Sequence, residues 1–251
     1  MESKFEFKDL MNNILSGLLW EASIVMIVYL VYPETLMMMD WKTIKDFDVV
    51  LFTLLIVFAF ILGIVLRGFE KPFTCIYRYI FGDAYFLVLE PEIEGKGKNN
   101  KIGIFYSIPK FKVILERLDI ATCNVIKEKL FNLGILANLS GSTSSKDLNC
   151  NFPLTTRKLR NIGIMSERYL IFNKIDGSYL RFKDLKNFFE SVSFPLFLTL
   201  VLAKWTIFCN VCSCWYFLFV ILIFILFILR YDYYMRNYVK DVFRLIFFAK
   251  V

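Results

Sequence analysis

The sequence predicts a membrane protein with four transmembrane α-helices in two hairpins and an inserted cytoplasmic α+β domain. Two observations carry this prediction: the chain has two pairs of long apolar stretches, and a basic, polar segment separates the pairs. The apolar stretches cover residues 14–32, 49–66, 193–209 and 213–229. The expected domains are an N-terminal hairpin (1–68), a cytoplasmic domain (69–192), a C-terminal hairpin (193–229) and a basic amphipathic tail helix (230–251).

The first hairpin contains the clearest membrane signal. Residues 49–66 include no charge and no proline across 18 positions. At about 1.5 Å of rise per residue, such a helix measures about 27 Å, close to the ~30 Å hydrocarbon core of a bilayer. The stretch 14–32 is too long for the apolar core of a signal peptide, and no A-x-A-like cleavage site follows it. We therefore expect it to be retained.

The second hairpin is predicted from two apolar stretches that nearly touch in the sequence. Only residues 210–212 form an obvious turn between them. We expect two helices in a tight hairpin. The alternative is a single span preceded by an interfacial segment, because Phe194 and Pro195 are able to begin a helix that lies in the membrane surface.

The distribution of charge predicts the orientation. The chain has a formal net charge of +7, and residues 67–193, with 20 basic and 13 acidic side chains, account for all of it. The loop at 33–48 has two lysines against four acidic residues, and the turn near residue 210 is uncharged. Because Lys and Arg favour the cytoplasmic side, we expect a multi-pass protein of the cell membrane with the middle domain and both termini in the cytoplasm.

The sequence contains no histidine, which excludes Ser-His-Asp and Cys-His catalysis and His-ligated zinc or haem. Cys209, Cys212 and Cys214 have the spacing C-x2-C-x-C, but no second CxxC pair accompanies them. We interpret them as small apolar residues at a helix turn; an external disulfide is the alternative. We expect no catalytic residue, no metal and no cofactor, and hence a protein that is not an enzyme.

Two charged residues lie inside apolar stretches, Glu21 in the first and Lys204 in the third. A charge near the bilayer centre costs about 2.5–3.5 kcal/mol on insertion scales, so each of them requires a partner or a route to water. We consider an intramembrane polar pair between them, because their expected depths are similar. In the alternative, Lys204 extends to the headgroups and Glu21 faces a neighbouring helix or is protonated. A role in ion conduction is a third interpretation.

The cytoplasmic domain is predicted to mix helices and strands. Residues 69–81 have the pattern of a short amphipathic helix, and 109–133 have helical spacing of apolar residues. Short runs of apolar and β-branched residues predict strands at 84–89 and 102–106. A β-hairpin is expected from strands 168–172 and 178–182, which flank an Asp-Gly turn signal.

Basic side chains of this domain form a predicted surface for an anionic ligand. Its members are Arg157, Lys158, Arg160, Arg168, Lys174 and Arg181. Three interpretations remain open: contact with anionic lipid, contact with a nucleic acid or nucleotide, and a simply solvated positive surface. The domain lacks the G-x4-G-K-[ST] motif of a nucleotide-binding loop, so the nucleotide interpretation has no motif to support it.

The tail repeats a basic residue every four positions, at Arg236, Lys240 and Arg244. Aromatic and aliphatic residues line the other face. This pattern predicts a basic amphipathic helix that extends the fourth span or lies on the inner leaflet. It also suits a helix that forms oligomers, because an aromatic-rich face seldom stays exposed to water.

Together these features favour a non-enzymatic sensor-effector, in which the cytoplasmic domain binds a partner or anionic ligand and modulates an oligomeric helix bundle. Membrane effectors of defence systems, including pores, share this layout with several unrelated classes, so the layout alone does not decide the function. The expected partners are the bilayer with its anionic headgroups and a homo-oligomer or other membrane subunits. The alternatives are a structural or assembly subunit of a membrane complex and, with less support, an enzyme acting on lipid phosphates.

Overall fold

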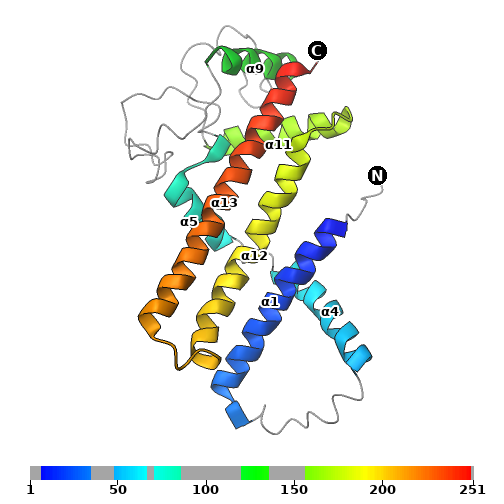
Figure 1. The fold of residues 1–251 in the computed structure, drawn as a ribbon. Coiled ribbons are helices and arrows are strands. Elements are labelled where there is room, and N and C mark those ends of the chain that lie inside the picture. Colours follow the sequence, from blue (N-terminus) through cyan, green and yellow to red (C-terminus); the bar gives the residue numbers. More distant parts are fainter. Residues whose placement is uncertain (1–6, 35–47, 67–70, 86–119, 136–155, 250–251) are drawn as a thin grey trace. The chain divides into compact units, whose positions relative to one another are not determined.

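A computed structural model describes residues 7–34, 48–66, 71–85, 120–135 and 156–249 (Figure 1). In chain order its helices are α1 (Phe7–Val31), α4 (Asp48–Val65), α5 (Lys71–Phe81), α9 (Ile120–Asn132), α11 (Thr156–Phe172), α12 (Ser178–Thr206) and α13 (Ser213–Phe248). The chain divides into two compact units. Unit 1 comprises Met1–Cys75 and Asn187–Tyr231, and unit 2 comprises Ile76–Lys186 and Asp232–Val251.

The prediction of an α+β domain is wrong, because the described residues form helices and no strand. Residues 168–172 are the end of α11 and residues 178–182 are the start of α12, so the Asp-Gly signal belongs to a connection between two helices. The buried residues Ile162, Ser166 and Leu170 recur every four positions, which is the period of a helix and not of a strand. Ala84 and Tyr85 are helical, while residues 86–89 and 102–106 lie outside the described part.

The prediction of four spans is also corrected. Within the described residues, three helices are long and apolar enough to cross a bilayer: Leu10–Val31, Ser178–Thr206 and Ser213–Phe248. A fourth apolar helix, counted over Phe52–Val65 of α4, is shorter than these three. The chain is therefore a helical membrane protein with three candidate spans and one shorter apolar helix.

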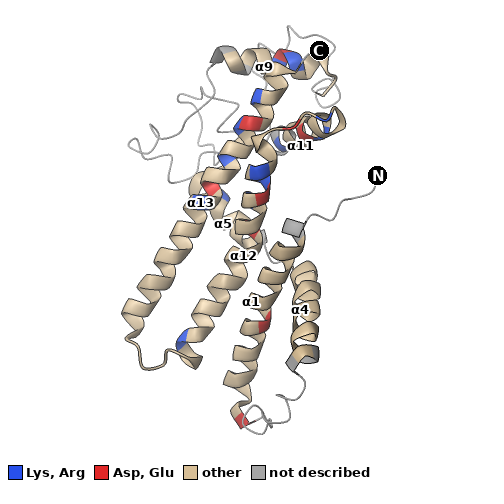
Figure 2. Ribbon diagram, turned by 45° about the vertical axis from the view of Figure 1, so that its right-hand side comes forward, with Lys and Arg blue, Asp and Glu red and all other residues tan. Residues whose placement is uncertain are grey.

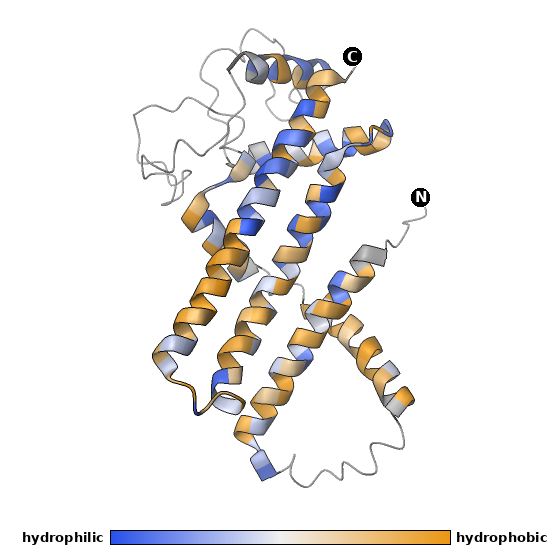
Figure 3. Ribbon diagram, in the orientation of Figure 1, coloured by the Kyte–Doolittle hydropathy of each residue, from blue (hydrophilic) through white to orange (hydrophobic). Residues whose placement is uncertain are grey.

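The tight hairpin predicted near residue 210 is confirmed. Helix α12 continues through Phe194 and Pro195 to Thr206, which removes the alternative of an interfacial segment there. Helix α13 begins at Ser213 and runs for 36 residues. The hydroxyl group of Tyr216 donates a hydrogen bond of 2.6 Å to the carbonyl oxygen of Leu200, so the two helices pack against each other close to the turn. Figure 3 shows that hydrophobic residues dominate the halves of both helices next to this turn.

Helices α1 and α4 of unit 1 pack with their backbones in close contact, side by side and antiparallel (Figure 2). A Cβ atom built on Gly17 would overlap the backbone of Ala59, and one built on Gly63 would overlap the backbone carbonyl of Asn13. Small residues permit this approach, which is how apolar helices gain van der Waals contact in lipid. The pairing of residue 17 with 59 and of residue 13 with 63 makes α4 run back along α1.

Unit 2 has its core around the C-terminal part of α13. Val239, Val242, Phe243 and Ile246 are almost fully buried, and their spacing of three and four residues places them on one helix face. Residues from α9, α11 and α12 pack against this face; they are Ile126, Leu130, Ile162, Leu170 and Tyr179. The apolar face predicted for the tail is therefore covered by the protein's own helices, and the tail is a direct extension of α13.

We expect Gly63→Ala to lower the free energy of unfolding by about 1–3 kcal/mol, because the added methyl group forces α1 and α4 apart. Gly17→Ala should act in the same direction. The measurement is thermal unfolding of the purified full-length protein in detergent. Leu18→Ala on the exposed side of α1 is the control and should change the free energy by no more than about 0.5 kcal/mol. Equal effects for all three variants would contradict the close packing.

Candidate functional site

Glu21 lies in the middle of α1, within a candidate span. One of its carboxylate oxygens is buried and has no hydrogen-bond partner among the described residues. In an apolar environment such an oxygen is costly to leave unpaired. Among the described residues of unit 1, Glu21 is therefore the one with a buried side-chain oxygen that lacks a hydrogen-bond partner.

Lys204 is only 6% exposed and lies two residues before Thr206, the last residue of α12. Its ammonium group donates hydrogen bonds to the carbonyl oxygens of Phe208, at 3.0 Å, and Cys209, at 3.2 Å. These carbonyl groups follow the last turn of the helix, where backbone acceptors lack partners within the helix and where the helix dipole favours a cation. Lys204 thus stabilises the end of α12 and the start of the turn.

The structure gives Glu21 and Lys204 different surroundings, and it has no ion pair between them in the part of the chain that it describes. The polar contacts between α1 and α12 come from uncharged residues instead. Ser16 donates a hydrogen bond to the carbonyl oxygen of Ser191, at 3.0 Å, and the hydroxyl groups of Ser23 and Thr199 lie 2.9 Å apart. Such hydrogen bonds hold helices together where water is scarce.

The six predicted members of the basic surface do not act alike. Arg157 and Lys158 lie in the first turn of α11, and their side chains are outside the described part. The side chain of Arg160 is used internally, in an ion pair with Asp83 at 2.7 Å. The remaining members are exposed and have no ion-pair partner in the described ranges; they are Arg168, Lys174 and Arg181.

The basic residues of the tail also differ in their contacts. Arg236 forms an ion pair with the buried carboxylate of Asp232 at 2.9 Å, and the hydroxyl group of Tyr77 donates to the other oxygen of Asp232 at 3.0 Å. Lys240 is only 5% exposed, whereas Arg244 is exposed. The tail therefore presents Arg244 to its surroundings and uses Arg236 within the protein.

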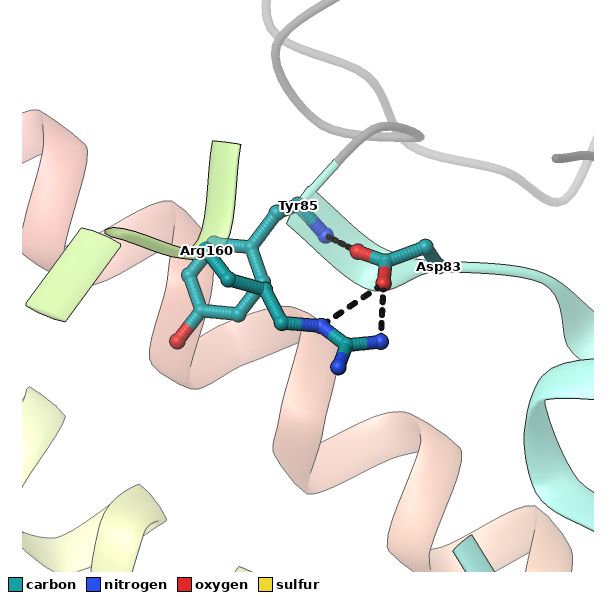
Figure 4. A network of polar contacts seen from close by, with 3 residues as sticks. All are labelled: Asp83, Tyr85 and Arg160. Atoms are coloured by element: carbon teal, nitrogen blue, oxygen red, sulfur yellow. Dashed lines mark hydrogen bonds and ion pairs between the residues drawn. The ribbon is translucent and has the colours of Figure 1, made fainter. Parts of the chain in front are cut away.

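A polar network joins the segment after α5 to α11 (Figure 4). Asp83, 6% exposed, accepts a hydrogen bond of 3.1 Å from the backbone N–H of Tyr85 with one oxygen. Its other oxygen accepts from Nε and Nη2 of Arg160 at 3.0 Å and 2.7 Å. Asp83 thus caps the turn of helix that begins at Ala84 and at the same time neutralises an arginine 77 positions later in the chain.

The network continues from Tyr85 to α13 and α12. Tyr85 is hydrogen-bonded to Tyr238, whose hydroxyl group donates to Oε2 of Glu167 at 2.7 Å. Glu167 also forms an ion pair with Lys183 at 2.7 Å. Burial raises the pKa of Tyr85 to about 12, so its phenol stays neutral under ordinary conditions. The network ties three helices of unit 2 together and satisfies the charged groups that it contains.

Sequence reasoning missed Asp83, Tyr85, Glu167 and Tyr238. A signal for Asp83 was present: Gly82 has a positive φ of 90°, as expected after a helix, and Asp is a preferred residue at the start of the next one. No comparable signal exists for Glu167 and Tyr238, which lie 71 positions apart. No group of three or more His, Cys, Asp or Glu residues able to hold a metal ion occurs in the described ranges.

The fold and these contacts define a helical membrane protein whose charged residues outside the apolar stretches are partly used inside unit 2 and partly exposed. Comparison with known proteins found no match to a protein-family model, a curated protein or a solved structure. The functional argument therefore depends on the residues of this chain.

We expect Asp83→Asn to lower the free energy of unfolding by about 1–3 kcal/mol, because it leaves Arg160 without its counter-charge. Combining it with Arg160→Gln should cost less than the sum of the single changes, with a coupling of about 1 kcal/mol. Chemical denaturation of the full-length protein measures all three. Arg168→Gln, on the same helix but exposed, is the matched control. Strictly additive changes would show that the ion pair does not contribute.

A second double-mutant cycle tests the intramembrane charges. We expect Glu21→Gln and Lys204→Met to have additive effects on thermal unfolding, because Lys204 binds backbone carbonyl groups of its own turn. Lys204→Met should destabilise the protein by about 1–3 kcal/mol. A double variant more stable than Lys204→Met alone by over about 1 kcal/mol would instead support the pair predicted from the sequence.

Proposed function

We propose that this chain is a non-enzymatic, multi-pass protein of the cell membrane that acts as a sensor-effector. In this proposal unit 2 binds an anionic ligand or partner through its exposed basic residues. Binding changes the packing of an oligomeric bundle formed by the apolar helices, as in a membrane effector or pore of the kind that defence systems use. Because unit 2 is helical in its described part, this proposal no longer includes an α+β domain.

The observation that carries the proposal is the continuity of α12 and α13. Residues 178–186 of α12 belong to unit 2 and residues 187–206 to unit 1, without a break in the helix. Helix α13 likewise contributes residues to both units. A helix is stiff along its axis. A change in the packing of the residues at one end of α12 or α13 therefore alters the packing of the residues at the other end. Exposed cations on the same unit supply a site for a signal that carries negative charge.

The same geometry supports an orientation with both termini in the cytoplasm. Helix α4 runs back along α1, and α13 runs back along α12, so each pair returns the chain to the side on which it began. Lys and Arg are concentrated in residues 67–193, and the positive-inside tendency assigns that segment to the cytoplasm. In this arrangement α4 returns the chain although it is shorter than the three candidate spans.

The test is reconstitution of the purified full-length protein in liposomes, with its size and its permeability to ions measured together. We expect a defined homo-oligomer that leaks ions. Asn187→Pro, which interrupts α12 where the two units divide, should change the leak, whereas Asn187→Ala should preserve it. A well-folded oligomer that never conducts, with or without soluble polyanions such as polyphosphate, would contradict the proposal.

A second function has one specific observation in its favour. The unpartnered oxygen of Glu21 suits a subunit whose intramembrane carboxylate is completed by another membrane protein. The chain would then be a structural or assembly subunit, unstable when purified alone. A stable homo-oligomer in the experiment above would argue against this function, and co-purification of a second membrane chain that is lost in Glu21→Gln would argue for it.

A further inference from the structure

The connection between α12 and α13 and the first turn of α13 contain three cysteines, Cys209, Cys212 and Cys214. All three are exposed, and each has a free thiol group in the structure. Cysteine is one of the residues most often buried in proteins, and a buried thiol is inert, whereas an exposed one is open to reaction. Packing therefore does not explain these residues, and their chemistry is the remaining explanation.

Side-chain contacts hold the two ends of this connection close together. Tyr216 of α13 donates a hydrogen bond of 2.6 Å to the carbonyl oxygen of Leu200 of α12. The ring of Tyr216 lies 5.5 Å from that of Phe208, and the rings of Trp205 and Phe217 lie 5.9 Å apart. The cysteines between these contacts belong to a short closed loop, so they are able to meet without a large movement of the helices.

The backbone of the connection is also fixed by hydrogen bonds. The N–H of Val211 donates to the carbonyl oxygen of Phe208 at 3.1 Å, which closes a β-turn between these residues. The ammonium group of Lys204 binds the carbonyl oxygens of Phe208 and Cys209. Cys209 is thus the second residue of the turn, and Cys212 follows the turn directly.

This geometry favours the pair formed by Cys209 and Cys212. A disulfide needs Cα atoms about 4.4–6.8 Å apart, and a β-turn brings residues three positions apart to within about 7 Å. The span from Cys209 to Cys212 has the length of the turn and overlaps it. The carbonyl oxygen of Cys212 accepts the N–H of Tyr216 at 3.1 Å, so Cys212 stands at the start of α13. Cys214 lies two positions further, and helix residues two apart do not face each other.

We propose that Cys209 and Cys212 are a redox-active dithiol that a small disulfide such as oxidised glutathione converts to a disulfide, while Cys214 stays a thiol. The thiolate of one cysteine attacks the small disulfide, which gives a mixed disulfide and one glutathione thiolate. The thiolate of the other cysteine attacks the cysteine sulfur of the mixed disulfide and releases the second glutathione thiolate. Two protein thiols are oxidised, one disulfide is reduced, and the two cysteine protons pass to the glutathione thiolates.

The second step takes place within one turn because the neighbouring thiol is at high local concentration. Groups joined by a short stretch of chain have an effective concentration of about 1 mM, about 1,000-fold above that of a second copy at about 1 µM. In the orientation proposed above the turn lies outside the cytoplasm, where disulfides persist. The inference does not rest on the sensor-effector function, because it requires only that a small disulfide reaches the turn.

The test treats the purified full-length protein with oxidised glutathione, alkylates free thiols with N-ethylmaleimide and cleaves with trypsin without reduction. Lys204 and Arg230 are consecutive cleavage sites, so the peptide of residues 205–230 contains these three cysteines and no other. We expect mass spectrometry to find this peptide two hydrogen atoms lighter and with one maleimide group. Reduction with dithiothreitol before alkylation should give three maleimide groups, one for each thiol.

Serine variants identify the pair. Cys209→Ser and Cys212→Ser should each lower the yield of the disulfide at least about ten-fold and leave a mixed disulfide with glutathione, because the resolving thiol is missing. Cys214→Ser is the matched control, with the same substitution next to the same turn, and should keep the disulfide and carry no maleimide. Thermal unfolding in detergent checks that all three variants fold, as expected for exposed positions.

Three results would overturn the proposal. Three maleimide groups after treatment with oxidised glutathione would show that the thiols do not react with a small disulfide. A disulfide that joins two copies of the peptide would assign these cysteines to a contact between molecules. Equal loss of the disulfide in Cys214→Ser would show that Cys209 and Cys212 are not the pair.

Discussion

The structure depends on one constraint: a polar group surrounded by apolar side chains or lipid has to find its partner within the protein. Unit 1 meets this constraint with short side chains that bond to backbone carbonyl groups and with a lysine that binds the carbonyl groups of its own turn. The positions of these residues fix how α1 and α12 meet. Glu21 is the exception in unit 1, because one of its buried carboxylate oxygens has no hydrogen-bond partner among the described residues.

The same constraint organises the charges of unit 2. Asp83, Glu167 and Asp232 are largely buried, and each of them neutralises a basic side chain that would otherwise have been available at the surface. The basic residues of this unit therefore fall into two sets with different roles. One set holds helices together, and the other set, which includes Arg168, Lys174, Arg181 and Arg244, remains exposed. The division matters for function, because only the second set is able to bind a ligand without dismantling the unit.

The sequence predicted the apolar helices and the turn near residue 210 well, because long uncharged stretches have few alternative structures. It failed for residues 168–182, where a short apolar run on each side of Asp176 and Gly177 suits a β-hairpin and a helical connection equally. Burial decided between them, since Leu170 and Tyr179 pack on one face of α13 that is distant in the sequence. The division of the cations into two sets was equally out of reach, because the partner of Arg160 lies 77 positions away.

The contact between α1 and α4 has a consequence for how the apolar helices of unit 1 are able to move. A Cβ atom on Gly17 or Gly63 would overlap the facing backbone, so the two helices approach more closely than side chains ordinarily allow. Sliding α4 along α1 would bring larger side chains opposite those backbones, and rotation of either helix about its axis would do the same. The two helices therefore form a rigid pair, and any rearrangement of the apolar helices has to move them together.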